Sequence, residues 1–249
     1  MRLAMIVEYD GTEYSGFQYQ KNARSIQEEI EKAIESLTEE PVRIKAAGRT
    51  DAGVHATGQV VAFDTDASYG PCTFQRALNA RLPQDIAVTS ARQVKPEFDP
   101  RRDAVSRLYR YTLLVSAVRS PLMRRASHRI QRPPDLDSMR AAAAHMEGAH
   151  DFANFGGSLE NPDASTIRRV DRIDIKSDGR LLKIDVEGNA FLPHQVRRMA
   201  GALVDVGTGR LTVNDIANQI SMAGDASPAR ALPSNGLCLV RVKYPDSPF

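Results

Sequence analysis

Hydrophobic positions in the N-terminal part of the chain alternate between a two-residue and a helical period. The two-residue period predicts strands over residues 3–9, 42–47, 59–64 and 86–94. The helical period predicts one helix that begins at Ser25, where Glu28 suits a capping box, and a second over residues 74–82. The order β-α-β-β-α-β is that of the ferredoxin-like split unit.

The same two periods return in the C-terminal part. They predict strands over residues 106–115, 168–177, 181–188 and 237–244, and helices over residues 135–146, 193–206 and 212–222. Asp178-Gly179 is a strong signal for a hairpin turn. The element order nearly repeats, so we expect an α+β fold of two ferredoxin-like (βαββαβ-type) halves with mainly antiparallel sheets and flanking helices. A cleft between the halves is the expected active site.

Two prolines within five residues, Pro96 and Pro100, indicate a connection between the halves. We therefore expect an N-terminal half at residues 1–95, a linker at 96–105 and a C-terminal half at 106–249.

The composition is that of a soluble globular protein: 249 residues, 42% hydrophobic and 26% charged. No apolar run approaches the roughly 18 residues that a membrane span needs, and Glu8 and Asp10 interrupt the first apolar run, which argues against a signal peptide. Cys72 and Cys238 are the only cysteines and suggest neither a disulfide framework nor a metal cage. We expect a cytoplasmic protein.

The basic residues are distributed unevenly although the net charge is only +2. Arginine supplies 26 of the 33 basic residues, and residues 101–132 hold nine arginines against one acid, Asp103. Arginine's planar fork suits phosphate and base contacts, so this stretch indicates a nucleic-acid surface. The alternative is that these arginines extend from strands and pair with acids elsewhere in the fold.

The stretch Gly48-Arg49-Thr50-Asp51-Ala52-Gly53-Val54-His55-Ala56 lies between two predicted strands. Its glycines allow a sharp turn around a charged centre, and a loop between adjacent strands is a rigid place for a reactive group. The competing interpretation is an ordinary Asp-containing turn. The spacing fits neither the G-x-x-x-x-G-K-[ST] nor the G-x-G-x-x-G phosphate-binding pattern.

The chain lacks the patterns of several enzyme classes. We find no paired acids at a glycosidase spacing, no H-E-x-x-H among the five histidines and no G-x-S-x-G elbow. What remains is a lone aspartate acting as nucleophile or base on a nucleic-acid component. A base taken out of a helix needs stacking and edge contacts, for which Tyr109 and an arginine, either Arg197 or Arg49, are suitable.

These motifs together resemble the tRNA pseudouridine synthase A (TruA) family, which isomerises uridines 38–40 of the tRNA anticodon arm. They run in family order along nearly the whole chain: Tyr9-Asp10-Gly11-Thr12, Gly16-Phe17-Gln18-Tyr19-Gln20, the stretch from Gly48 to Ala56, Arg107-Leu108-Tyr109-Arg110-Tyr111, Asp151-Phe152, Asn189-Ala190-Phe191-Leu192, Val196-Arg197, Gly201, Val206-Gly207, Gly236-Leu237 and Val242-Lys243-Tyr244-Pro245. Phe17 departs from the tryptophan often found in the family, and Gln195 from a methionine.

The resemblance implies a role for four residues. Asp51 matches the essential aspartate that breaks the uracil–ribose bond, and Arg49 an arginine thought to help displace the target base. Tyr109 matches a tyrosine that stacks on the flipped uracil, and Arg197 the arginine that pairs with the catalytic carboxylate. The resemblance also implies the pseudouridine synthase fold, a homodimer that binds tRNA, and chemistry without cofactor or metal.

Three functions stay open at this point. The first is the tRNA pseudouridine synthase, the second a non-catalytic module that binds structured RNA through the same basic cleft, and the third a hydrolase of small nucleosides that uses Asp51. The arginine-rich stretch argues against the third, and a rigidly held carboxylate beside anionic RNA argues against the second.

Overall fold

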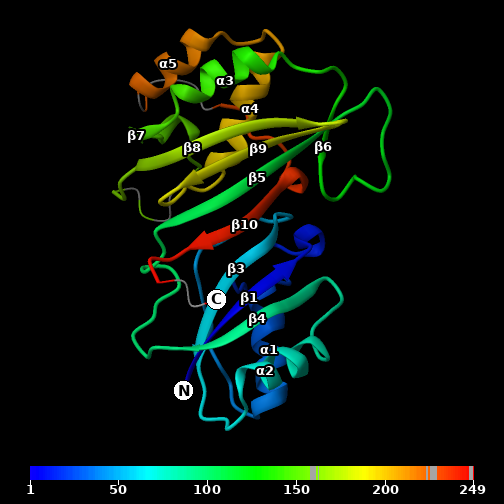
Figure 1. Ribbon diagram of the computed structural model, residues 1–249, viewed down its shortest axis with the longest axis vertical. Helices are drawn as coiled ribbons and strands as arrows, with labels where there is room; N and C mark the ends of the chain where they lie inside the picture. Colours follow the sequence, from blue (N-terminus) through cyan, green and yellow to red (C-terminus); the bar gives the residue numbers. More distant parts are fainter. Residues whose placement is uncertain (158–160, 162, 223, 225–228, 247–248) are drawn as a thin grey trace. The chain divides into compact units, whose positions relative to one another are not determined.

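Both ends of the chain build the first of two units in the computed structural model (Figure 1), which describes residues 1–157, 161, 163–222, 224, 229–246 and 249. This unit consists of Met1–Arg107 and Cys238–Phe249, and the second unit of Leu108–Leu237. The division differs from the expected one in two respects. Residues 96–105 belong to the first unit, and so do the last twelve residues, 238–249.

The segment expected to be a linker is packed into the first unit. The Phe98 ring lies 5.2 Å from the Tyr244 ring, centroid to centroid, and the Phe98 carbonyl accepts a hydrogen bond from Arg2 Nε at 2.7 Å. Asp99 is only 7% exposed. Prolines mark turns in any connection, whereas the aromatic and acidic side chains between them decide whether the connection is packed.

The first unit contains one sheet, two α-helices and a short 3₁₀ helix: β1 (Arg2–Tyr9), η1 (Gly11–Glu13), α1 (Ile26–Thr38), β2 (Lys45–Ala46), β3 (His55–Asp64), α2 (Pro71–Asn79), β4 (Ile86–Val94) and β10 (Leu237–Lys243). The sheet order is β4-β1-β3-β10, and β2 pairs with β3. β1 is antiparallel to both β3 and β4. β10 is parallel to β3, with Cys238 opposite His55.

Helix α1 begins where the sequence predicts. Ser25 Oγ accepts the Glu28 N–H at 3.3 Å, and Ile30 and Ile34 are fully buried. The Glu28 carboxylate pairs with Lys32 at 2.8 Å, so the structure shows the serine half of the expected capping box. Helix α2 begins at Pro71, earlier than predicted, and packs on β4.

The second unit contains the following strands and helices: β5 (Ser106–Val115), β6 (His128–Ile130), α3 (Leu136–Ala144), β7 (Gly148–Asp151), η2 (Ala153–Phe155), β8 (Ile167–Asp178), β9 (Leu181–Gly188), α4 (Gln195–Gly207), α5 (Val213–Ser221) and η3 (Ser234–Gly236). The sheet order is β5-β9-β8-β7, with β6 parallel to β5. The predicted β8–β9 turn is present, with Gly179 at φ 59°. β6 and β7 were not predicted, because three or four residues show no readable period.

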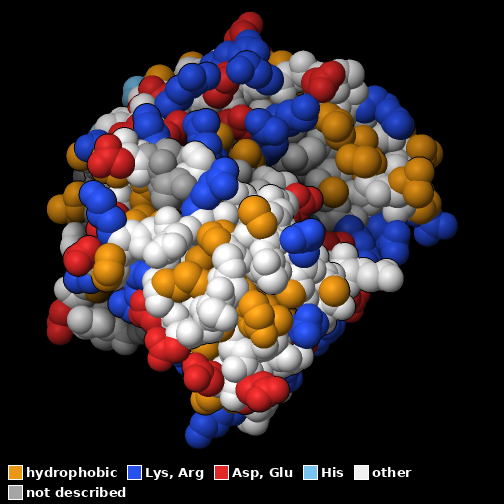
Figure 2. All heavy atoms as spheres, turned by 60° about the horizontal axis from the view of Figure 1, so that its bottom comes forward, with side chains coloured by type: hydrophobic (Ala, Val, Ile, Leu, Met, Phe, Trp, Pro, Cys, Tyr) orange, Lys and Arg blue, Asp and Glu red, His pale blue; other side chains and the backbone are white. Residues whose placement is uncertain are grey.

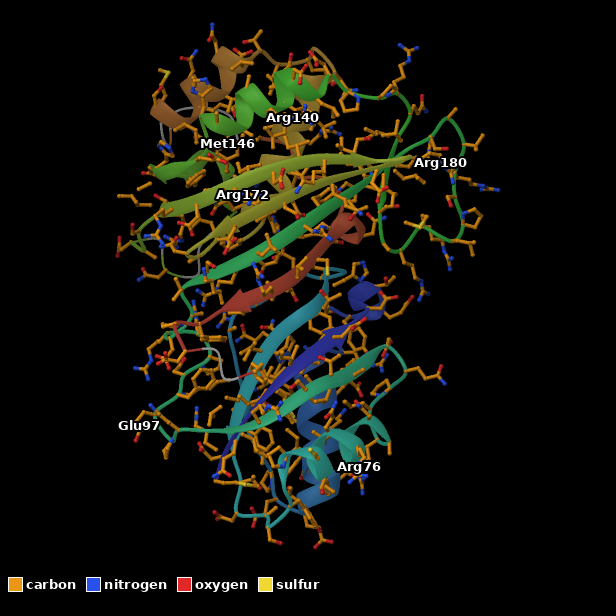
Figure 3. All side chains as sticks on the ribbon, in the orientation of Figure 1. Arg76, Glu97, Arg140, Met146, Arg172 and Arg180 are labelled. Carbon is orange, nitrogen blue, oxygen red and sulfur yellow. The ribbon has the colours of Figure 1, made fainter. Side chains whose placement is uncertain are left out.

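Helix α3 packs against α4, α5 and β8. Arg140, labelled in Figure 3, reaches from α3 to the carbonyl of Ile175 on β8 at 3.3 Å. α5 has a complete capping box: Asp215 N–H donates to Thr212 Oγ1 at 3.2 Å, and Thr212 N–H donates to the Asp215 carboxylate at 2.7 Å.

The mixed α+β architecture with mostly antiparallel sheets confirms the fold class expected from the sequence. In the first unit the order βαββαβ is present as predicted, although β2 is only two residues long. None of the helices in the described part of the chain is both long and apolar enough to cross a membrane.

Candidate active site

The loop that carries Arg49 and Asp51 is fixed by backbone bonds to the segment that follows β1. The Phe17 N–H donates to the Thr50 carbonyl at 3.0 Å, and the Gly53 N–H donates to the Tyr14 carbonyl at 3.2 Å. Within the loop, the Val54 N–H donates to the Asp51 carbonyl at 3.1 Å. Asp51 therefore lies between backbone positions that are held from two sides.

Two glycines make this close approach possible. A Cβ atom on Gly11 would lie 2.0 Å from the Val54 carbonyl oxygen, well inside contact distance. Gly16 has φ +103°, and a Cβ atom there would meet the Thr50 carbonyl oxygen at 3.0 Å. The two motifs, Tyr9-Asp10-Gly11-Thr12 and the stretch from Gly48 to Ala56, thus form one packed structure.

A buried polar network lies beneath the loop. The hydroxyls of Tyr9 and Thr50 are 2.8 Å apart, and Gln59 Nε2 donates to the Gly48 carbonyl at 2.8 Å. Gln59 is fully buried. Burial raises the pKa of the Tyr9 hydroxyl despite its hydrogen bonds to Thr50 and Gln59, so Tyr9 stays protonated and available as a donor.

His55 lies at the end of the loop, where β3 begins. Its Nδ1 atom is 3.1 Å from the Gly11 nitrogen and 3.1 Å from Asp10 Oδ1. A neutral ring accepts the Gly11 N–H, and a protonated ring donates to Asp10. Both contacts tie the two motifs together, which gives His55 a structural role.

Several arginines of the basic stretch have structural partners. Arg107 is 9% exposed, and its guanidinium donates to the carbonyls of Ala47 at 2.9 Å and Arg101 at 2.7 Å. Arg110 forms a two-pronged pair with Asp185, both distances being 2.7 Å. The alternative interpretation of the stretch therefore holds for part of it. On the face shown in Figure 2, Lys and Arg side chains are interspersed with Asp and Glu.

Tyr109 and Arg197 belong to the second unit. The Tyr109 ring meets the Phe191 ring edge-on, with centroids 5.4 Å apart. Arg197 Nε donates to the Leu232 carbonyl at 2.7 Å, which fixes the plane of the guanidinium. A Cβ atom on Gly201 would lie 2.0 Å from the Arg230 carbonyl, so only glycine lets this segment pass so closely over α4.

The structure thus places the four predicted site residues in two pairs. Arg49 and Asp51 share the β2–β3 loop of the first unit, and Tyr109 on β5 and Arg197 on α4 lie in the second. Sequence reasoning missed the support beneath the loop, Tyr9, Thr50 and Gln59, because its members are 41 and 50 residues apart.

Comparison with known proteins identifies the family of this chain. The sequence matches the family described as tRNA pseudouridine synthase over residues 5–101 and 142–245. The chain belongs to the tRNA pseudouridine synthase family. The first matched range contains the Asp51 loop and the second contains Arg197, so the family recognised from the motifs is confirmed.

Relatives of this tRNA pseudouridine synthase family member align end to end with it. Proteins named "tRNA pseudouridine synthase A" are 46% identical over 244 residues in Geobacter sulfurreducens and 43% identical over 242 residues in Pelobacter propionicus. Each alignment covers 97% of this chain and 99% of the relative. A protein of the same name in Shewanella woodyi is 37% identical and covers 99% of this chain and 94% of its own length.

A solved structure described as "Crystal Structure of a Cbf5-Nop10-Gar1 Complex" aligns with 96% of this chain and 58% of its own, at 12% identity and a TM-score of 0.33. A similarity of that size carries no inference about mechanism. Among the described residues, no group of three His, Cys, Asp or Glu side chains is placed to hold a metal ion.

Proposed function

We propose that this family member isomerises uridine to pseudouridine at positions 38–40 of the tRNA anticodon arm, with Asp51 as its catalytic carboxylate. The observation that carries the proposal is the loop geometry. Asp51 lies between the fixed carbonyl of Thr50 and the Gly53 N–H that is bound to Tyr14, on the stretch that lies inside the first matched range. A rigidly placed carboxylate is what a nucleophile or general base requires.

The reaction is a rearrangement in which nothing is added or lost. The bond between N1 of uracil and C1′ of ribose breaks, the base turns, and a bond from C5 to C1′ forms. The proton on C5 leaves, and N1 gains a proton. Asp51 serves either as the nucleophile that breaks the first bond or as the base that takes the proton.

Three other residues complete the proposed chemistry. Arg49, two residues from Asp51, helps to displace the target base, and Tyr109 stacks on the uracil once it has left the helix. Arg197 pairs with the carboxylate. Its Nε donates to the Leu232 carbonyl at 2.7 Å, which fixes the plane of the guanidinium, and a guanidinium in a fixed plane suits a charge-assisted contact. We extend the proposal to a cytoplasmic homodimer that needs no cofactor.

The test is a product assay on an unmodified tRNA transcript, with pseudouridine mapped nucleotide by nucleotide. We expect pseudouridine in the anticodon arm with the wild-type protein and none with Asp51→Asn, which should still bind the tRNA. Wild-type protein that makes no pseudouridine in any folded tRNA would remove the proposal.

The same assay separates the two rival functions. A non-catalytic RNA-binding module would form no modified nucleoside and would respond little to Asp51→Asn. A nucleoside hydrolase would release uracil from free uridine without folded RNA. The match to the synthase family favours neither.

A further inference from the structure

A pocket of about 320 Å³ lies in the first unit beside the catalytic loop. Arg49 is part of its wall, and the remaining wall comes from stretches that are distant in sequence, among them Phe17, Lys45 and Arg101. Its volume is at the lower end of the range for small-molecule sites, so it has room for about one nucleotide and not for a helix.

The lining carries an excess of positive charge: three cations, Lys45, Arg49 and Arg101, and one acid, Asp99. The Asp99 carboxylate already has hydrogen-bond and ion-pair partners within the protein. The backbone N–H groups of Arg101 and Arg102 donate to Asp99 at 3.0 and 3.1 Å, and Lys45 Nζ donates at 3.2 Å. Burial raises the pKa of Asp99, but these donors outweigh burial and bring the pKa to about 2.

The guanidinium of Arg101 is exposed, and within the described part of the chain it forms no hydrogen bond or ion pair. A cation in this position is available to an incoming anion. Because Lys45 already pairs with Asp99, Arg101 is the cation through which the pocket favours an anionic group such as a phosphodiester.

Part of the lining is apolar. Phe17 and Ile44 are 2% and 4% exposed and supply a floor for a flat ring. Gln27 is occupied, since its Nε2 donates to Glu31 at 2.8 Å and its Oε1 accepts the Tyr19 N–H at 3.0 Å. Gln18 is exposed and has no hydrogen bond among the described residues, so its amide can meet the edge of a base.

An apolar floor, an available amide and an available cation are what a single nucleotide in an RNA strand requires. We propose that this pocket binds the nucleotide next to the target uridine, with its phosphodiester at Arg101 and its base against Phe17 and Ile44. This inference rests on the proposed function, because only an RNA substrate places a second nucleotide beside Asp51.

The experiment uses anticodon stem-loop RNAs in which one phosphodiester, on the 5′ or the 3′ side of the target uridine, is replaced by a neutral methylphosphonate. Dissociation constants and kcat/KM are measured for the wild type and Arg101→Ala. Arg92→Ala, on β4, and Arg76→Ala, on α2 (Figure 3), are the controls, since each removes a cation that does not line the pocket.

We expect Arg101→Ala to weaken binding of the unmodified RNA about tenfold, as loss of a hydrogen bond to a charged group does. The dissociation constants of both control variants should stay within about twofold of the wild-type value. One of the two neutral linkages should weaken wild-type binding by a similar factor, and should add little in Arg101→Ala, because both changes remove the same contact. An abasic residue on that side should weaken binding about fivefold or more.

Additive losses at both linkages, or an Arg101→Ala protein that binds like the controls, would overturn the pocket proposal. Binding is measured separately from product. If the losses from Arg101→Ala and from one neutral linkage overlap but the wild type forms no pseudouridine, the pocket proposal holds and the proposed reaction is wrong. If the wild type forms pseudouridine normally but the two losses do not overlap, the reaction holds and the pocket proposal is wrong.

Discussion

The two units connect equivalent antiparallel strands in contrasting ways. In the second unit, β8 and β9 are joined by Gly179 and Arg180 alone. In the first, residues 47–54 separate β2 from β3. The short turn is determined by its own residues, since the left-handed φ of Gly179 matches the twist of the strands. The long loop is determined by distant ones, because Tyr14, Phe17 and Gln59 hold its backbone. A loop held from outside can present a side chain rigidly, whereas the tight turn only reverses the chain.

The most direct test of this difference between the two connections is to remove one carboxylate from each of them. Asp51→Asn should lower pseudouridine formation at least about 10³-fold, in the range of a lost acid–base group. Asp178→Asn should leave activity within about twofold, because the Asp178 side chain is 73% exposed and its one ion pair among the described residues is with Lys183 on the surface.

Single-turnover assays on tRNA measure both variants, with melting temperature as the check on folding. Equal losses in the two variants would show that the long loop has no special role.

A methyl group added to a glycine tests how tightly each connection is packed. In Gly11→Ala, the new Cβ would lie 2.0 Å from the Val54 carbonyl, and backbone must move. We expect a loss of about 3 kcal/mol in the free energy of unfolding. In Gly179→Ala, nothing lies within 4 Å, and only the left-handed φ opposes the change, at about 1 kcal/mol.

Urea denaturation compares the two alanine variants directly. The interpretation fails if Gly179→Ala is the more destabilising of the pair.

Tyr9→Phe tests the network beneath the catalytic loop. It removes the hydroxyl that meets Thr50 at 2.8 Å and leaves the buried Thr50 Oγ1 without this partner. The cost should be about 1–2 kcal/mol in unfolding free energy, together with a fall in kcat that exceeds any change in KM, because the loop would hold Asp51 less rigidly. A loss of stability with unchanged kcat would mean that the network supports the fold and not the loop geometry.

The smallest effect is expected at the surface of the tight turn. Lys183 Nζ lies 3.1 Å from Asp178 Oδ2, and the two side chains are 31% and 73% exposed. Lys183→Ala should change the unfolding free energy by no more than about 0.5 kcal/mol, measured by the same urea titration at low and high salt. A change above about 1 kcal/mol would contradict the view that this turn is fixed by its backbone.

Local patterns predicted the elements that depend on local physics. The apolar face of α1 with its Ser25 cap, the Asp178-Gly179 turn and the Asp51 loop could all be read from neighbouring residues. The packing of Phe98 on Tyr244 could not, because the partner is 146 positions away in the chain and no local period records it.

The same limit applies to the candidate site. Asp51 and Arg49 stand out through their spacing, and Tyr109 and Arg197 were assigned by resemblance. Lys45, Asp99 and Arg101 have no common motif and meet only in the folded unit. The helix predicted to start at Pro193 begins at Gln195 instead, because His194 adopts a left-handed φ of 61°. No local sequence pattern indicates this conformation of His194.

The parallel pairing of Cys238 with His55 has a consequence for synthesis of the protein. The sheet that carries the Asp51 loop lacks its β10 strand until residues 237–243 have left the ribosome. Residues 108–237 are complete earlier and form a compact unit with its own strands and helices. The nascent chain can therefore fold its middle before its beginning is finished, and deletion of residues 238–249 would remove a strand from the sheet of the catalytic unit.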